Sequence, residues 1–209
     1  MSVVGFVVAG GRSRRMGRDK ALVPWGETDL LGHALARLRR VTDDVRILCG
    51  PSPRYADRGV PVVVDRLADT GPIAGVVAGL EACGGRPGLF VAVDLPLVPV
   101  ALFTHLAGLG GSWDGVVPVS PRGPEPLCAV YAPSCLGPIL RQVAAGEMRM
   151  TSFWRDVRVI ELGPPQLRAF GDPEVFFRNV NTPADLQDAS SATSAAARSA
   201  GRRRRLRGR

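Results

Sequence analysis

Five cationic side chains lie within nine positions near the start of this 209-residue chain. They are Arg12, Arg14, Arg15, Arg18 and Lys20. Two adjacent glycines, Gly10 and Gly11, precede them, and a turn without Cβ atoms can bring backbone N–H groups close to a phosphate oxygen. A folded surface does not need so many cations in one place, whereas a ligand with several negative charges does. These residue types therefore predict a loop that binds a nucleoside triphosphate.

The glycine spacing differs from that of both common phosphate-binding loops. A dinucleotide-binding loop has glycines at positions one, three and six, whereas this chain has Gly10, Gly11 and Gly17. A Walker loop continues from glycine to lysine and then to serine or threonine. The corresponding stretch here reads Gly-Arg-Asp-Lys, so neither loop type is predicted.

A second candidate centre is Asp94, in the segment VAVDLPLV. It directly follows a run of small and apolar residues, so its carboxylate is partly desolvated and needs a partner. Mg²⁺ takes one or two carboxylates and completes its shell with phosphate oxygens and water. One aspartate facing a triphosphate is therefore sufficient for a metal site. From the residues alone, an aspartate that caps the next turn is an equally good interpretation.

Two further segments place polar groups beside predicted helix starts. Asp65 opens the segment DRLADTGPIAG, in which Gly71 and Pro72 precede a helix whose first N–H groups can meet a polar or negative ligand. Near the C-terminal end, Asn179 and Asn181 are two positions apart, so both amides point the same way on an extended segment. Each segment also fits an ordinary junction between a loop and a helix.

Strands and helices alternate along the chain, which is typical of an α/β domain. Apolar runs predict strands at 3–8, 45–48, 62–64, 89–93, 116–119, 127–131 and 157–162, and helical spacing predicts helices at 30–38, 76–82, 102–109 and 136–144, with a last one starting near Pro183. Parallel strands place the loops at their carboxyl ends on one edge of the sheet, where such sheets bind ligands. Because Gly10, Asp65 and Asp94 each follow a predicted strand, we expect them to meet at that edge.

Charge divides the chain into a nearly neutral body and a basic tail. The formal net charge is +8, and seven arginines after Asp188 contribute +7 of it, so the body carries only +1. The tail has almost nothing to bury. We therefore expect one domain of ordinary size at 1–188 and a basic, disordered tail at 189–209. An arginine run without interleaved aromatic residues is a weak signal for nucleic-acid binding, and we expect no nucleic-acid partner.

The cysteines and the hydropathy pattern indicate a cytoplasmic protein. Four cysteines lack any CxxC spacing and lie among apolar or small residues, so buried thiols are predicted. They are Cys49, Cys83, Cys128 and Cys135. The two histidines, His33 and His105, lie in predicted helices far from any cysteine, which disfavours a zinc site. No apolar run approaches the length of a membrane span, and the chain enters its first strand without a signal-peptide pattern.

The segment from Val7 to Lys20, VVAGGRSRRMGRDK, resembles the signature LAGGxSxRMGxDKAL of nucleotidyltransferases with a single Rossmann-like domain. Its second glycine and its Asp-Lys pair are most similar to those of the molybdenum cofactor guanylyltransferases. Relatives that transfer cytidylyl groups usually have alanine at the first of these glycines and proline before the lysine. With the segments around Asp65, Asp94 and Asn181, the resemblance spans about residues 3–187. It implies a three-layer Rossmann-like nucleotidyltransferase fold, with a mostly parallel central sheet and helices on both faces.

The resemblance also implies a role for each candidate residue. Lys20 and Arg15 would offset charge on the triphosphate of GTP, and Asp94, in an Asp-x-Pro motif, would bind Mg²⁺. The backbone amides of residues 9–11 would cradle the phosphates, and no catalytic histidine is expected. The implied catalytic set is Lys20, Arg15 and Asp94, and the implied nucleotide-binding set is Val8, Ala9, Gly10, Gly11, Lys20, Asp65, Asp94, Asn179 and Asn181, with Asp69 as a weaker candidate.

The implied reaction transfers GMP from GTP to molybdopterin or Mo-molybdopterin and releases pyrophosphate. Because the acceptor already ends in an anionic phosphate monoester, the reaction needs alignment and charge neutralisation more than a general base. The implied partners are GTP and the pterin, together with molybdoenzyme chaperones or cofactor-biosynthesis proteins. Mg²⁺ is the implied cofactor, and no membrane partner is expected.

Two departures from the family pattern bear on specificity. Family members commonly carry an asparagine after the strand at 45–48, where this chain has Cys49-Gly50. The strand that faces the pterin often carries a basic residue or a His-Pro pair, where this chain has Glu125-Pro126. The alternatives are therefore cytidylyl transfer to the molybdenum cofactor, guanylyl transfer to a phospholactate-type acid, and a non-catalytic protein that carries the pterin.

Overall fold

The strand expected at 3–8 forms as β1 (Val4–Val8), and all five of its residues are buried. It pairs in parallel with β4 (Val45–Leu48) on one side and with β6 (Gly88–Ala92) on the other. Side chains of β1 alternate between two apolar layers, with Val7 in one and Phe6 in the other. This alternation is the period of two that a strand imposes, and it places β1 at the centre of the fold.

Residues 2–10, 19–67, 70–182 and 184–189 are described by the computed structural model of this chain. Their main sheet has the strand order β10-β7-β9-β6-β1-β4-β5, and β8 pairs with β7 outside this path. The strands not yet bounded are β5 (Val62–Val63), β7 (Gly115–Ser120), β8 (Gly123–Pro124), β9 (Cys128–Tyr131) and β10 (Val159–Leu162). β9 is antiparallel to both β6 and β7, whereas the other neighbours along the path are parallel. The prediction of a mostly parallel central sheet is confirmed.

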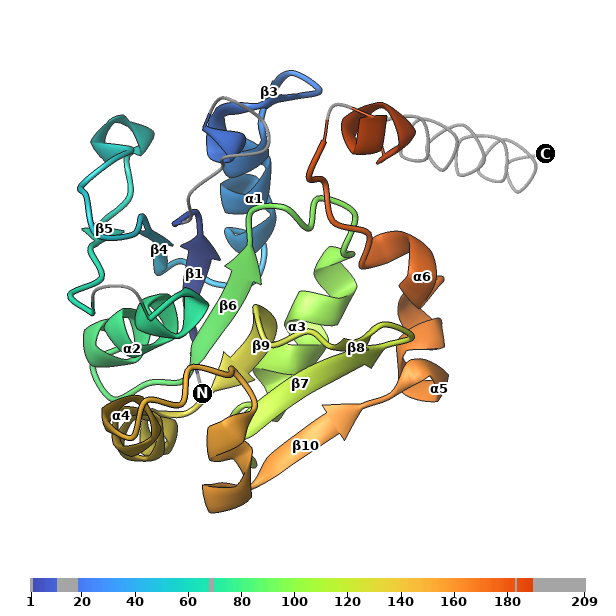
Figure 1. The fold of residues 1–209 in the computed structure, drawn as a ribbon. Coiled ribbons are helices and arrows are strands. Elements are labelled where there is room, and N and C mark those ends of the chain that lie inside the picture. The colour runs from blue at the N-terminus through green and yellow to red at the C-terminus, as the bar shows by residue number, and fades with distance from the viewer. Residues whose placement is uncertain (1, 11–18, 68–69, 183, 190–209) are drawn as a thin grey trace.

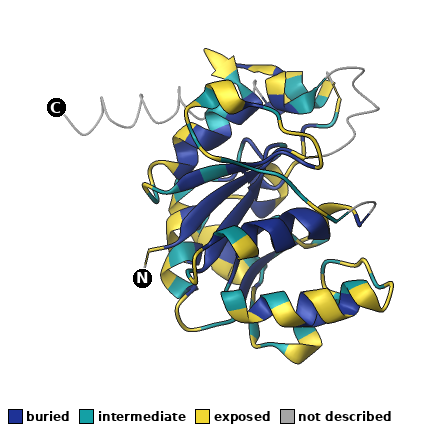
Figure 2. Cartoon of the chain, turned by 90° about the vertical axis from the view of Figure 1, so that its left-hand side faces the viewer, coloured by how far each residue is buried: buried dark blue, intermediate teal, exposed yellow. Residues whose placement is uncertain are grey.

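Helices cover both faces of this sheet (Figure 1). α1 (Leu30–Leu38) and α3 (Val100–Leu109) pack into the apolar layer that contains Val7, and α2 (Pro72–Ala82) and α4 (Leu136–Ala144) pack into the layer that contains Phe6. The short helices α5 (Pro164–Leu167) and α6 (Pro173–Phe176) contribute to the first layer. Figure 2 shows the buried strands between helices whose outer faces are exposed. The expected three-layer α/β architecture is therefore present.

The helix α1 has a defined start and a defined apolar face. The Asp29 carboxylate accepts a hydrogen bond from Gly32 N at 2.7 Å and so caps the first turn. Just before it, β2 (Pro24–Trp25) and β3 (Thr28–Asp29) form a small hairpin that turns at Gly26, whose φ is +59°. Two-residue strands show no periodicity that sequence analysis could detect, so this hairpin was not predicted.

The other departures from the predicted elements are also short. Bounds of the predicted strands and longer helices shift by a few residues, and β10 starts at Val159, where its pairing with β7 begins. The 3₁₀ helices are η1 (Lys20–Leu22), η2 (Ala56–Arg58), η3 (Pro133–Cys135), η4 (Ser152–Asp156) and η5 (Arg168–Phe170). The predicted last helix is present over 184–189. All four cysteines are buried free thiols, as predicted.

Two further expectations concern the basic tail and the absence of a membrane span. The basic tail, apart from residue 189, lies outside the described residues, so its predicted disorder stays a prediction. Within the described part, none of the helices has both the length and the apolar character that crossing a bilayer requires.

A carboxylate at the amino-terminal end of the sheet makes a pH-dependent contribution to stability. Asp44 accepts hydrogen bonds from Arg46 at 2.9 and 3.0 Å and pairs with Arg86. These contacts lower the pKa of Asp44 to about 2. Because the folded state holds this carboxylate ionised, the stabilisation is present above about pH 4 and is lost as the pH falls toward 2.

We therefore expect Asp44→Asn to lower the free energy of unfolding by about 1 kcal/mol at neutral pH, a value reduced for the partial exposure of the pair. The difference from the wild type should shrink as the pH falls toward 2. Urea titrations at pH 7 and pH 3 measure both effects. An equal destabilisation at the two pH values would contradict this account.

Candidate functional site

Four parallel strands end at one edge of the sheet, and a candidate residue lies two positions beyond the end of three of them. Gly10 follows β1, Gly50 follows β4, Asp65 follows β5 and Asp94 follows β6. In Figure 1 the arrows of β1 and β6 both point toward this edge. The expectation that the residues after these strands share an edge is confirmed, and it is the edge at which open α/β sheets bind ligands.

The ends of β1 and β4 lie against each other at this edge. A Cβ atom on Gly10 would lie 2.8 Å from Gly50 N, so a side chain does not fit there without a backbone shift. Gly50 itself has φ +84°, a conformation that favours glycine. The geometry of this turn therefore favours a glycine at position 50.

The backbone amides at the end of β1 do not point to an open phosphate site, as was expected, but form hydrogen bonds with β4. Ala9 N and Gly10 N both donate to Leu48 O, at 2.9 and 3.0 Å, and Val8 O accepts from Val93 N. Val8 and Ala9 are buried. The first two of the three amides expected to cradle phosphate are thus directed to β4 in this structure. The third, Gly11, lies outside the described residues, as do Arg15 and Asp69.

Three polar side chains from distant parts of the chain meet beyond the ends of β1 and β6. Lys20 Nζ donates to Asp94 Oδ2 at 2.8 Å and to Asn181 Oδ1 at 2.7 Å. The Lys20 and Asp94 side chains are 15% and 26% exposed, so the pair is shielded but reachable by a ligand. We call these three residues the lysine cluster. Its members are 74 and 161 positions from Lys20 in sequence, so only the fold brings them together.

The backbone holds Asp94 and Asn181 in register with each other. Val180 N donates to Asp94 O at 3.0 Å, which joins the C-terminal segment to the end of β6. The Asp185 carboxylate accepts from Asn181 N and Thr182 N at 2.9 and 2.8 Å, and Asp185 N lies 3.2 Å from Thr182 Oγ1. This reciprocal pattern caps the helix at 184–189, and its hydrogen bonds lower the pKa of Asp185. The amide of Asn181 is therefore presented on a fixed turn.

Asn179 does not join the lysine cluster. Its side chain is exposed and makes no hydrogen bond to another described residue. Asn181 alone reaches Lys20, although both asparagines lie in the predicted segment. A shared ligand for the two amides stays a prediction.

Asp94 fits a metal site with a single protein carboxylate. Among the described residues, no group of three or more histidine, cysteine, aspartate or glutamate side chains could hold a metal ion. Mg²⁺ does not require such a cage, because phosphate oxygens and water complete its octahedral shell. A partly exposed carboxylate at the binding edge of the sheet provides the hard oxygen donor that this mode of binding needs.

Asp65 has an unpaired oxygen at the same edge. Its backbone N donates to Gly50 O at 3.1 Å, which places it beside the turn after β4. Asp65 Oδ1 is buried and makes no hydrogen bond to any described residue, and burial raises the pKa of this carboxyl. A buried acceptor without a partner is costly, so this position suits a ligand with hydroxyl or amino donors, such as a ribose or a base.

A further carboxyl, Glu125, lies on the other side of Asp94. β9 pairs with β6 with Cys128 opposite Val91, and Ala92 N donates to Leu127 O. Glu125 precedes β9 by three positions, at the start of a turn in which Cys128 N donates to Glu125 O at 2.9 Å. Burial raises the pKa of Glu125, and the nearby Asp94 carboxylate contributes to the increase.

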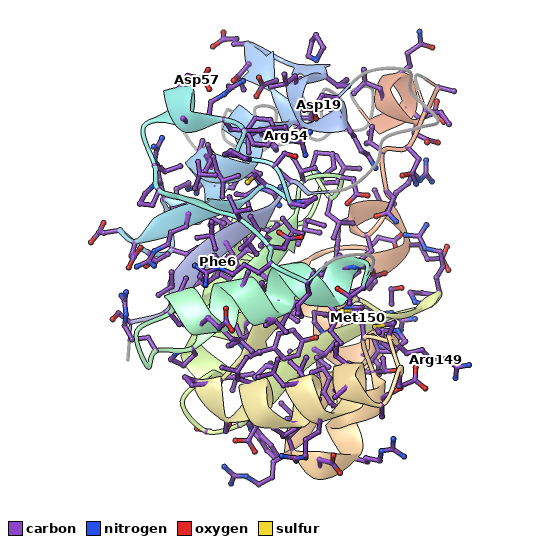
Figure 3. The ribbon with its side chains drawn as sticks, turned by 60° about the vertical axis from the view of Figure 1, so that its left-hand side comes forward. Phe6, Asp19, Arg54, Asp57, Arg149 and Met150 are labelled. Atoms are coloured by element: carbon purple, nitrogen blue, oxygen red, sulfur yellow. The ribbon has the colours of Figure 1, made fainter. Side chains whose placement is uncertain are left out.

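Sequence analysis missed an anchor behind Lys20. Asp19 Oδ2 accepts hydrogen bonds from Arg54 Nη1 at 2.9 Å and from Tyr55 Oη at 2.8 Å, and Asp19 Oδ1 accepts from Ala21 N. Arg54 Nη2 also donates to Cys49 O at 2.9 Å, and Figure 3 shows Asp19 and Arg54 side by side. The anchor therefore links the lysine-bearing turn to the end of β4. Its segment has no periodicity, and the only available signal was the Asp-Lys pair of the signature.

Comparison with known proteins identifies close relatives. The family described as "MobA-like NTP transferase domain" matches residues 5–160. The chain is 34% identical over 186 residues to a probable molybdenum cofactor guanylyltransferase of Pelotomaculum thermopropionicum, covering 89% of this chain and 91% of the relative. It is 31% identical over 196 residues to the molybdenum cofactor guanylyltransferase of Desulfosudis oleivorans, covering 93% and 97% of the two chains.

Solved structures show the same fold. The crystal structure of molybdopterin-guanine dinucleotide biosynthesis protein A from Archaeoglobus fulgidus matches with a TM-score of 0.79 and 26% identity, covering 92% of this chain and all of that one. A 2-C-methyl-D-erythritol 4-phosphate cytidylyltransferase from Thermus thermophilus matches with a TM-score of 0.68 and 15% identity, covering 93% and 100% of the two chains. The second likeness concerns the fold alone.

Proposed function

The chain belongs to the MobA-like NTP transferase family, and on that premise we propose that it is a molybdenum cofactor guanylyltransferase. It transfers GMP from GTP to molybdopterin or Mo-molybdopterin and releases pyrophosphate. The relatives that carry this name share about a third of their residues with the chain over nearly its whole length. The observation that carries the proposal is the lysine cluster, which joins a cation, a carboxylate and an amide at the binding edge of the sheet.

The lysine cluster supplies the charge neutralisation that phosphoryl transfer needs. Asp94 would hold Mg²⁺, which supplies electrostatic stabilisation of the phosphate oxygens. Lys20 adds a compact positive charge beside that carboxylate, and Asn181 orients its ammonium. Because the acceptor phosphate is already anionic, alignment of the two substrates replaces a general base.

The order of the strands suggests where each substrate lies. Asp65 and Gly50 lie on the β4–β5 side of Asp94, and the unpaired Asp65 oxygen supports nucleoside binding there. In-line displacement requires the acceptor to approach from the side opposite the leaving pyrophosphate. The family resemblance assigns the pterin to the segment that includes β9, so the pterin would enter on that side, beside Glu125.

Several finer assignments depend on the family resemblance. Arg15 and Gly11 would contact the triphosphate, and Val8, Ala9 and Gly10 would line its site. Asn179 would border the nucleotide beside Asn181. A cytoplasmic location and handover of the product to molybdoenzyme chaperones or cofactor-biosynthesis proteins complete the proposal.

The test is pyrophosphate release by the purified protein with Mg²⁺ and molybdopterin, with GTP, CTP, ATP and UTP assayed in parallel. Release with GTP alone supports guanylyl transfer and shows that Cys49-Gly50 permits guanine selection. Release with CTP would move the protein to the cytidylyl branch. The absence of release with any nucleotide would favour another acceptor or the pterin carrier, and Mg²⁺-dependent tightening of GTP binding would then argue against a carrier.

The anchor behind Lys20 leads to a kinetic prediction. Tyr55→Phe removes the hydroxyl that donates to Asp19 and leaves the aromatic ring in place. The loss of one hydrogen bond to a carboxylate is worth about 1.5–3 kcal/mol at most, and Arg54 still holds Asp19. We expect the KM for GTP to rise about threefold to tenfold, with kcat changed less than about twofold. Steady-state kinetics provide the measurement, and an unchanged KM would contradict a role for the anchor in GTP binding.

A further inference from the structure

Two polar side chains of α1 reach the loop that joins β6 to α3. His33 Nε2 lies 3.0 Å from Pro96 O, and Arg37 Nη1 donates to Leu95 O at 3.0 Å. Arg37 Nη2 also donates to Val98 O. The two side chains are four positions apart and therefore lie one above the other on the same helix face. One helix thus binds three of the four carbonyl oxygens of residues 95–98.

Arg37 is buried without an acidic partner. It is 8% exposed, and its guanidinium lies 4.7 Å from the centre of the Phe103 ring. No described carboxylate pairs with it, and burial lowers its pKa to about 10, so it stays protonated at neutral pH. A buried charge satisfied only by carbonyl oxygens and a ring is expensive compared with an apolar residue of similar size. Stability alone is therefore a poor explanation for an arginine at this position.

His33 acts as a second donor to the same loop. A carbonyl oxygen only accepts, so the proton lies on Nε2 in the contact with Pro96 O. Burial and the nearby Arg37 charge lower the pKa of His33, which keeps the ring neutral at pH 7. Its ring also packs against Trp25, with the centroids 5.7 Å apart.

The loop that these donors hold begins immediately after Asp94. Leu95 N donates to Ala92 O, and Asp94 O accepts from Val180 N. Two contacts therefore orient the Asp94 carboxylate. One is its ion pair with Lys20, and the other is the hold of Arg37 on the backbone that immediately follows Asp94. A change in the loop would move the carboxylate away from Lys20 without altering any group that contacts the substrates.

We propose that Arg37, assisted by His33, is a positioning residue that fixes the loop after β6 so that the Asp94 carboxylate faces Lys20 and is placed to hold the metal ion. The inference rests on the proposed function, in which Asp94 holds that ion. Neither side chain contacts the substrates. Their effect passes through the carbonyl oxygens of Leu95, Pro96 and Val98.

The test compares Arg37→Met with Arg37→Lys and with the matched control Arg40→Met, which alters an exposed arginine just beyond the same helix. Three quantities are measured on each folded variant: exchange of the Val180 amide hydrogen, the dissociation constant of Mn²⁺ by electron paramagnetic resonance in the presence of GTP, and kcat and KM. For Arg37→Met we expect faster Val180 exchange, about tenfold weaker Mn²⁺ binding and about tenfold lower kcat, with the KM for GTP within about twofold.

Two further variants, Arg37→Lys and His33→Phe, distinguish a positioning role from a packing role. Arg37→Lys should recover part of each effect, because an ammonium can reach one of the two carbonyl oxygens but not both. His33→Phe keeps the ring contact with Trp25 and removes the donor, so it should give smaller effects in the same direction. Arg40→Met should match the wild type in all three measurements.

A lower melting temperature of Arg37→Met with unchanged Val180 exchange and unchanged Mn²⁺ affinity would overturn the proposal and assign Arg37 to packing alone. If Arg37→Met does not fold, the same comparison is made with Arg37→Lys and His33→Phe. Val180 exchange in the protein without ligands does not depend on activity. A wild-type protein that transfers no GMP would therefore refute the proposed function, while the exchange rates would still decide whether Arg37 positions the loop.

Discussion

Replacing Asp94 with asparagine is expected to reduce kcat by about a thousandfold or more while the protein stays folded. The amide keeps the size of the side chain and an oxygen that can accept from Lys20. It lacks the negative charge that a hard divalent cation requires. Asp94→Asn therefore separates metal binding from the hydrogen bond to Lys20, whereas Asp94→Ala removes both.

Metal titration and single-turnover kinetics measure this effect. Both variants should lose the Mg²⁺ dependence of GTP binding, and Asp94→Ala should be no more than modestly less active than Asp94→Asn. Asp57→Asn serves as a control, because Asp57 lies in η2 and its side chain is 79% exposed. Retention of Mg²⁺-dependent transfer in Asp94→Asn would exclude Asp94 as the essential metal ligand.

The sheet and its binding edge could be predicted because their signals are local. A buried strand such as β1 is an uninterrupted apolar run, and parallel strands must end at a common edge. Placing Asp65 and Asp94 at that edge therefore needed only the order of the elements. The short hairpin β2–β3 could not be found in this way, because two residues per strand are too few to show a period.

The contacts within the site depend on distances that the sequence does not encode locally. Nothing near Lys20 indicates that Asn181 accepts from its ammonium, because the two are 161 positions apart. The amides of Ala9 and Gly10 were expected to face phosphate on the strength of the glycines, yet the parallel register with β4 directs both to Leu48 O. Side-chain chemistry was thus more predictable than the partner of each group.

Arg37 shows how a regular pattern can hide a functional position. The leucines of α1 recur at helical spacing and predict an apolar inner face, and an arginine among them would normally be assigned to the solvent side. Its long side chain instead turns inward to the carbonyl oxygens of the loop after β6. Hydropathy predicts the face of a helix but not an inward cation whose partners are backbone groups.

The last large effect concerns Lys20, which is the only lysine among the 27 lysines and arginines of the chain. Lys20→Ala removes the donor to both Asp94 and Asn181, and we expect kcat/KM for GTP to fall about a thousandfold or more. Because the pair is partly exposed, the expected loss of stability is only about 1 kcal/mol. Thermal unfolding and pyrophosphate release by the same preparation measure the two effects.

Lys20→Arg shows whether charge alone is sufficient. A guanidinium is planar and larger than an ammonium, and it cannot place one compact charge between a carboxylate 2.8 Å away and an amide oxygen 2.7 Å away. We therefore expect Lys20→Arg to recover less than about a tenth of the wild-type kcat/KM. Because Lys20 is the only side-chain amine, an amine-specific reagent should inactivate the protein, and GTP with Mg²⁺ should protect it. A Lys20→Ala variant that keeps most of its activity would refute the phosphate-binding role.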